Sequence, residues 1–127
     1  QEKPPKKPLE LIKKVLDKIA DNHVAAKDFF SAIEKDIPRL WDFIVKKDLI
    51  TLDPKKPLKV RETPIYQRGV AGASVDAPGP FDADRQTYYN VTPLDDMPAA
   101  KQESYLREYN NCTFHTLNIR EALPGHY

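Results

Sequence analysis

The sequence predicts an α+β fold that is mainly α-helical, with amphipathic helices packed around a small sheet. In the first and last thirds of the 127 residues, apolar side chains recur every three or four positions, as in amphipathic helices. The middle third holds short runs of β-forming residues between glycines and prolines. Hydrophobic residues make up 40% and charged residues 31%, typical of a globular chain of single-domain size.

Residues 1–8 are rich in proline and lysine and are expected to form a solvated linker. A helical segment is expected over 9–50. Its first helix has one apolar stripe and ends near Asp21, with the stripe formed by Leu9, Ile12, Leu16 and Ile19. A second helix is expected over 25–35, with Phe29, Phe30 and Ile33 buried.

Asp36 followed by Ile37-Pro38 resembles a helix N-cap with proline in the first turn. We therefore expect a third helix that starts there and ends near Lys47. The side chains expected to be buried on it are Leu40, Trp41, Ile44 and Val45.

Residues 51–127 are predicted to form a strand-and-loop layer that leads into a last helix. Residues 58–63 alternate like a half-buried strand, which Pro64 ends or limits to a sheet edge. Loops surround the short apolar run 70–75, and residues 86–92 are rich in β-formers and predicted to form a strand.

The last helical stretch is expected to begin after Asp95-Asp96, which would cap it. Asn110-Asn111 is expected to divide it into two segments. Its apolar spacing is carried by Tyr105, Tyr109, Cys112, Thr116, Ile119 and Leu123. On this spacing Cys112, the single cysteine, is expected to be an inert core thiol.

Composition argues against several classes of function. The formal net charge is +1, so no bulk field favours nucleic acid as a partner. No stretch approaches the roughly 18 apolar residues that a spanning helix needs. The chain starts at Gln1 without a leader, so membrane contact is expected only through an N-terminal anchor outside these residues.

The residues that suggest chemistry are Arg120-Glu121-Ala122-Leu123-Pro124-Gly125-His126. In zinc hydrolases a helix can carry His-Glu and a second histidine one turn later, with the glutamate as general base beside the two ligands. Glu121 and His126 match the base and the second ligand. Arg120 cannot bind zinc, because a guanidinium has no lone pair to donate.

Spacing alone leaves the geometry of this motif open. At about 100° per residue, His126 would point away from the helix face of Arg120. Pro124-Gly125 favours an ordinary helix stop, and the alternative is a kink or bulge that brings His126 round.

Residues 57–127 resemble the bacterial domain-of-unknown-function family eight hundred and eighty-five, whose members carry a His-Glu-x-x-Pro-Gly-His signature. The resemblance is carried by 109–111, 118–127, Thr63-Pro64, the loops at 72–74 and 78–81, and Tyr88-Tyr89-Asn90-Val91-Thr92-Pro93. The position of the family's first histidine is occupied by Arg120.

This resemblance implies a longer, mainly helical protein of unknown function, related to zinc metallopeptidases and exported, periplasmic or lipid-anchored in a bacterium. It implies Glu121 as general base and His126 as zinc ligand. By the same analogy strand 88–92 would lie at the sheet edge beside the cleft, with Tyr89 and Asn90 among the residues that bind a peptide substrate.

The departure at Arg120 leaves two main hypotheses. The chain is a segment of a zinc-dependent hydrolase, with zinc in the full-length protein and none expected in this fragment alone, or it is a non-catalytic relative that binds peptides. A helical packing domain of no recognised family is a third possibility.

Three roles are open for Arg120 itself: it would pair with a carboxylate of the protein, bind a carboxylate of the substrate, or lie exposed. His23 and His115 are interpreted as structural.

Overall fold

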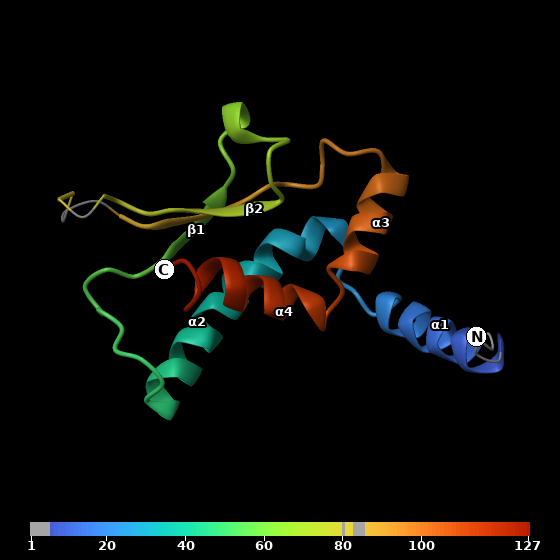
Figure 1. Ribbon diagram of the computed structural model, residues 1–127. Coiled ribbons are helices and arrows are strands. Elements are labelled where there is room, and N and C mark those ends of the chain that lie inside the picture. Colours follow the sequence, from blue (N-terminus) through green and yellow to red (C-terminus); the bar gives the residue numbers. More distant parts are fainter. Residues whose placement is uncertain (1–5, 80, 83–85) are drawn as a thin grey trace, which may run out of the picture.

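The computed structural model describes residues 6–79, 81–82 and 86–127. It confirms an α+β fold that is mainly helical, with a small mixed sheet (Figure 1). The helices are α1 (Lys6–Ala20), α2 (Phe29–Lys47), α3 (Ala99–Glu108) and α4 (Thr113–Leu117). The strands are β1 (Lys59–Glu62), β2 (Ala73–Asp76) and β3 (Tyr88–Val91). Short turns of 3-10 helix, η1 (Ala26–Asp28) and η2 (Ile65–Gln67), and a π-helical turn, η3 (Asn118–Ala122), lie between or after them.

The strands are arranged in the order β1-β3-β2, with β1 parallel and β2 antiparallel to β3. Neighbouring residues on a strand point to opposite faces, so this sheet has an apolar and a polar face. The row that joins the core contains Val60, Tyr89 and Val75. The next row, on the polar face, contains Arg61, Asn90 and Ser74.

The core lies between the apolar face of the sheet and the helices α2, α3 and α4 with η3 (Figure 1). Its fully or almost fully buried side chains include Phe29, Ile33, Ile37, Ile44, Tyr89, Val91, Leu106, Phe114 and Leu123. Burying one such side chain contributes about 1.5–3 kcal/mol relative to leaving it exposed. In the described part of the chain, no helix combines the length and hydropathy of a membrane-spanning segment.

The N-terminal helix differs from the prediction at its start. Residues 1–5 of the predicted linker lie outside the described residues, and α1 already begins at Lys6. Pro8 lies in its first turn, where the missing N–H has no intrahelical partner to lose. The predicted apolar stripe is present on α1, but its side chains are exposed.

The prediction of two helices between 25 and 47 is wrong, because α2 is one continuous helix with Pro38 inside it. An interior proline removes one backbone hydrogen bond and costs about 3 kcal/mol. The buried side chains before and after Pro38 offset this cost, namely Phe29, Ile33, Ile37 and Ile44. Asp36 is therefore a buried residue of the helix interior and not an N-cap, and Val45, predicted to be buried, is 56% exposed.

The break at Asn110-Asn111 is confirmed, since α3 ends at Glu108 and α4 begins at Thr113. The Asn110 side chain causes it by accepting hydrogen bonds from the backbone N–H groups of Cys112 and Thr113, at 3.0 and 3.3 Å. The break also rotates the buried face of the second segment. Phe114 and Leu117 are buried there, whereas Cys112, Thr116 and Ile119 are exposed. Cys112 is thus not a core thiol.

The prediction that Asp95-Asp96 caps the following helix is also wrong. The N-cap of α3 is Pro98, with no side-chain cap hydrogen bond. Asp96 instead accepts a hydrogen bond from Arg68 at 2.8 Å. The same guanidinium donates to the Thr63 carbonyl and to Glu62, so it ties the loop after β1 to two other segments.

The aromatic cluster between α2 and α3 gives this fold a pH dependence at high pH. The Tyr105 ring packs against Phe29 and Tyr109, with ring centroids 5.8 and 4.6 Å away. Burial raises the pKa of Tyr105 to about 12, above the ordinary value of 10.0. The unfolded chain therefore loses this proton first, and stability that is complete below pH 10 is lost as the pH rises toward 12.

We expect urea denaturation to show a free energy of unfolding that falls between pH 9.5 and 11.5, with a smaller fall in Tyr105→Phe. That variant has no hydroxyl to ionise and keeps the ring contacts. Equal slopes in the two proteins would contradict the assignment to Tyr105.

Candidate functional site

The candidate site is built by the chain reversal that follows α4. Helix α4 continues directly into the π-helical turn η3. Backbone N–H groups beyond it bond back to carbonyls five or six residues earlier: Leu123 to Asn118 at 3.0 Å, Gly125 to Ile119 at 3.0 Å, and Tyr127 to Ala122 at 3.1 Å. The Leu123–Pro124 peptide bond is cis. These three hydrogen bonds fold the backbone after η3 back against the helix end, and turns of this wide type are frequent at functional sites.

Gly125 is the residue that allows this close approach. A Cβ atom at this position would lie 1.7 Å from the Arg120 carbonyl oxygen and 2.8 Å from that of Ile119. Both neighbours are backbone atoms and cannot move aside as a flexible side chain can. The Pro124-Gly125 pair is therefore a tightly packed reversal and not simply an exposed helix stop.

The reversal brings His126 next to Glu121. Their side chains approach to 3.5 Å between His126 Nε2 and Glu121 Oε2. Glu121 is 20% exposed in its side chain and His126 is 64% exposed, so the pair lies at the surface with the carboxylate partly covered. Of the two geometries that spacing left open, the structure has the one in which His126 is brought round.

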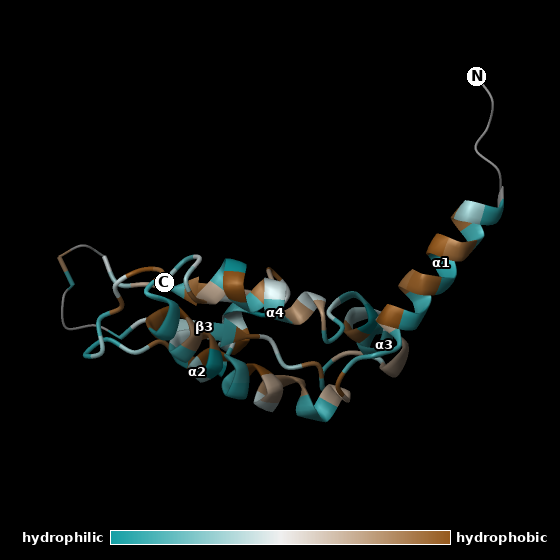
Figure 2. Ribbon diagram, turned by 90° about the horizontal axis from the view of Figure 1, so that it is seen from below, coloured by the Kyte–Doolittle hydropathy of each residue, from teal (hydrophilic) through white to brown (hydrophobic). Residues whose placement is uncertain are grey.

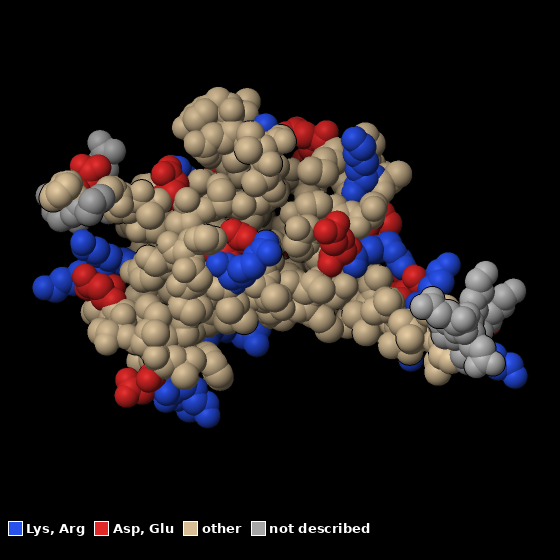
Figure 3. Space-filling model, in the orientation of Figure 1, with Lys and Arg blue, Asp and Glu red and all other residues tan. Residues whose placement is uncertain are grey.

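Arg120 lies beside the same carboxylate. Its NH2 group is 2.7 Å from Glu121 Oε1, while its own side chain is 72% exposed. Two of the three roles considered for Arg120 therefore hold together, because its side chain is exposed and also paired with a carboxylate. Its predicted substrate-binding role stays a prediction. Lys/Arg and Asp/Glu side chains are interspersed over the face shown in Figure 3.

Beneath η3 lies a buried polar network that the sequence did not predict. The Asp36 carboxylate accepts a hydrogen bond from Asn118 Nδ2 at 2.9 Å and lies 2.9 Å from His115 Nδ1. Asn118 Oδ1 in turn accepts a hydrogen bond from the Tyr89 hydroxyl at 3.1 Å. Asn118 is 0% exposed, and it joins α2, β3 and the first position of η3. One feature of the sequence could have indicated this network: Asp36 follows the apolar Ile33 by three positions, which places its carboxylate on the buried face of the helix.

The two histidines interpreted as structural, His23 and His115, each contact a carboxylate on a helix. His115 links α4 to α2 through Asp36. His23 lies 2.8 Å from the Val24 carbonyl through Nδ1 and 3.2 Å from Glu103 through Nε2.

Tyr89 and Asn90, predicted to bind substrate, point to opposite faces of the sheet. Tyr89 is fully buried on the core side. Burial raises the pKa of Tyr89, and the negative charge of Glu121 raises it further. Asn90 is 1% exposed on the polar face, where it accepts a hydrogen bond from Arg61 Nε at 2.7 Å. Neither role in substrate binding is tested by these contacts.

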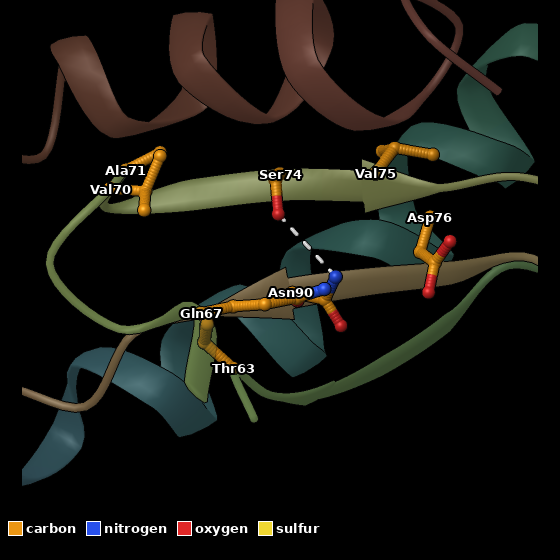
Figure 4. A pocket seen from close by; sticks show the side chains of 8 residues that line it. All are labelled: Thr63, Gln67, Val70, Ala71, Ser74, Val75, Asp76 and Asn90. Carbon is orange, nitrogen blue, oxygen red and sulfur yellow. Dashed lines mark hydrogen bonds between the residues drawn. The ribbon is translucent and has the colours of Figure 1, made fainter. Parts of the chain in front are cut away.

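The expectation that strand 88–92 lies at the sheet edge is wrong, because β3 is the central strand. The edge strand that packs against η3 is β2. Sheet order depends on contacts between distant segments, which the residues of one strand do not encode. Across β2 and β3 a cavity of about 270 Å³ opens on the polar face, with Ser74 and Asn90 turned toward each other (Figure 4).

The donor atoms of the site fall short of a complete zinc site. A catalytic zinc takes about three protein ligands. No group of three or more His, Cys, Asp or Glu side chains that could hold a metal ion occurs within residues 6–79, 81–82 and 86–127. The reversal supplies one imidazole and one carboxylate, and the carboxylate is paired with Arg120.

Comparison with protein families supplies the relationship. Residues 6–127 match the family described as bacterial protein of unknown function (DUF885). The chain belongs to this family. The match includes the helices before residue 57, to which the resemblance seen in the sequence did not extend. A packing domain of no recognised family is thereby excluded. A comparison with curated proteins finds no match.

A solved structure supports the same relationship. It is described as a putative lipoprotein of unknown function from Shewanella oneidensis. The two chains share 50% sequence identity and superpose with a TM-score of 0.81 over 100% of this DUF885 chain. The match spans only 22% of the relative's chain.

Proposed function

We propose that these residues form part of the active-site cleft of a zincin-like hydrolase that cleaves peptides. The observation that carries the proposal is the placement of His126 and Glu121 side by side at 3.5 Å on the reversal after η3. A zinc hydrolase of this type holds an imidazole ligand and a carboxylate that would serve as general base next to each other.

In this proposal His126 offers a lone pair on Nε2 to zinc, and Glu121 is the general base. The metal would supply a Lewis acid and an activated water. Its remaining ligands would come from outside these 127 residues, since the described residues do not complete the set. Arg120 would hold the Glu121 carboxylate in place or bind a carboxylate of the substrate.

The edge strand β2 supports a peptide as the substrate. In the described part of the sheet, β2 pairs with β3 on one side only, and it packs against the turn that carries Glu121. An open strand edge can pair with an extended peptide through backbone hydrogen bonds. A peptide bound along β2 would run next to the His126–Glu121 pair.

The test is the metal content of the full-length protein, measured by elemental analysis per mole of folded chain. About one zinc per chain is the expected result, with lower occupancy in His126→Ala and unchanged occupancy in Tyr66→Phe, whose side chain is exposed and remote in sequence. If the protein contains no zinc even after dialysis against it, the proposal fails.

A second candidate is a non-catalytic relative that binds peptides. It is favoured by the 2.7 Å contact between Arg120 and Glu121, which engages the proposed base with a fixed positive charge. The variant Arg120→His distinguishes the two. Zinc binding gained by this variant, from none in the unmodified protein, indicates an otherwise intact site that has lost its metal. Absence of zinc in both favours the binding role.

We also propose that the full-length protein is exported and lipid-anchored, because the related Shewanella oneidensis structure is described as a putative lipoprotein. Recovery of the protein in a washed membrane fraction that detergent solubilises is the expected result. Recovery in the cytosol would contradict it.

A further inference from the structure

The stripe along α1 is an exposed apolar surface on a regular element. Six aliphatic side chains between positions 9 and 19 are 39–64% exposed, namely Leu9, Leu11, Ile12, Val15, Leu16 and Ile19. They follow the three-and-four spacing of a helix that buries one face. Figure 2 shows these apolar positions as brown bands on α1, which projects from the rest of the molecule.

Polar contacts fix the position of α1 without covering its stripe. Arg107 of α3 lies 3.9 Å from Asp17 and bonds to Asp21. Just after the helix, Asn22 accepts hydrogen bonds from the side chain and backbone of Asn111, at 2.8 and 2.9 Å. The helix is therefore attached by its polar side and its C-terminal end, and the apolar face points away from the body.

Charged residues border this face on both sides. With about 100° of rotation per residue, Lys13 lies along one border of the stripe and Lys18 along the other, while Lys14 lies opposite. All three are exposed. A surface that packs on α1 would thus meet an apolar centre between two positive margins.

We propose that the stripe of α1 is the docking face for an amphipathic helix with Asp or Glu along its margins, supplied by the remainder of the full-length DUF885 chain. Such a helix would bury the six aliphatic side chains and place acidic residues near Lys13 and Lys18. In the Shewanella oneidensis relative, more than three quarters of the chain lies outside the matched part, which provides ample sequence for this helix.

Two other occupants fit the surface less well. A second copy of α1 would bring lysine margins against lysine margins, and like charges at such positions destabilise helix pairs. Helices that lie on a lipid surface commonly carry aromatic anchors on the apolar face, and α1 contains no Phe, Trp or Tyr.

The experiment measures thiol labelling in the full-length protein, with Cys112 and any other reactive cysteine replaced by serine. Leu16→Cys places a thiol on the stripe, and Lys14→Cys is the matched control on the opposite face. We expect a maleimide to label Leu16→Cys at least about tenfold more slowly than Lys14→Cys, because a packed helix excludes the reagent. Circular dichroism confirms that both variants are folded, and Ile12→Cys provides a second position on the stripe.

A further variant tests the chemistry of the partner. Reversing the margins with Lys13→Glu and Lys18→Glu is expected to speed labelling of Leu16→Cys several-fold, by repelling the acidic margins of the docked helix. Equal labelling at positions 14 and 16 in the full-length protein overturns the proposal. So does protection that rises with protein concentration, which indicates a second copy, or protection that requires anionic vesicles, which indicates a lipid surface.

Discussion

Replacing Gly125 with alanine is expected to lower the free energy of unfolding by about 3 kcal/mol or more, because the added methyl group meets fixed backbone. Its Cβ would lie 1.7 Å from the Arg120 carbonyl oxygen and 2.4 Å from the carbonyl carbon. The reversal must open to relieve this clash, and His126 then moves away from Glu121. Urea denaturation measures the loss of stability.

Gly79→Ala is the matched control for this substitution. Among the described residues, a Cβ at position 79 would meet only the Asp82 carboxylate, at an ordinary contact distance of 3.6 Å. We expect a change within about 1 kcal/mol, in either direction. A Gly125→Ala protein as stable as Gly79→Ala would show that the backbone does not approach so closely there.

Local patterns predicted the elements whose causes are local. The stripe of α1, the strand over 88–91 and the break at Asn110-Asn111 all follow from side chains within a few residues. The same patterns failed where packing decides. Pro38 and Asp36 look like a helix start, yet the buried Ile33 and Ile37 hold α2 continuous through them.

The errors about which face of a helix is buried have the same physical origin. A spacing of three or four identifies a helix, but the face that is buried depends on what packs against it. After the break, Phe114 and Leu117 face the core, while Ile119 on the predicted stripe is 45% exposed. The stripe of α1 was identified correctly, although among the described residues its side chains stay exposed and outside the core.

The candidate site was predictable in its residues and not in its geometry. Glu121 and His126 were identified by residue type, but a separation of five positions points them apart on an ideal helix. What brings them together is the π-helical turn and the backbone contact at Gly125. The position of β2 beside η3 is likewise a property of sheet order.

Asn118→Leu is expected to lower the free energy of unfolding by about 2–4 kcal/mol, since it leaves the buried Tyr89 hydroxyl without a partner and takes one donor from the buried Asp36 carboxylate, which keeps its contact with His115. The Asp36 carboxylate, 4% exposed in its side chain, would lose a donor at 2.9 Å. The Tyr89 hydroxyl would lose its acceptor at 3.1 Å. Leucine has the same number of side-chain heavy atoms as asparagine and branches at the same carbon, so the substitution leaves no cavity and the loss reports mainly on the hydrogen bonds.

The matched control is Asn111→Leu, which removes a 2.8 Å side-chain hydrogen bond to Asn22 at the surface. Water replaces that partner, so the cost should stay under about 1 kcal/mol. Combining Asn118→Leu with Tyr89→Phe should cost less than the sum of the single variants, because the second change removes a hydroxyl that the first has already orphaned. Strict additivity would show that Tyr89 and Asn118 act separately. Coupling would establish that the residue which begins η3 is held from below by β3, so that the position of Glu121 depends on that strand.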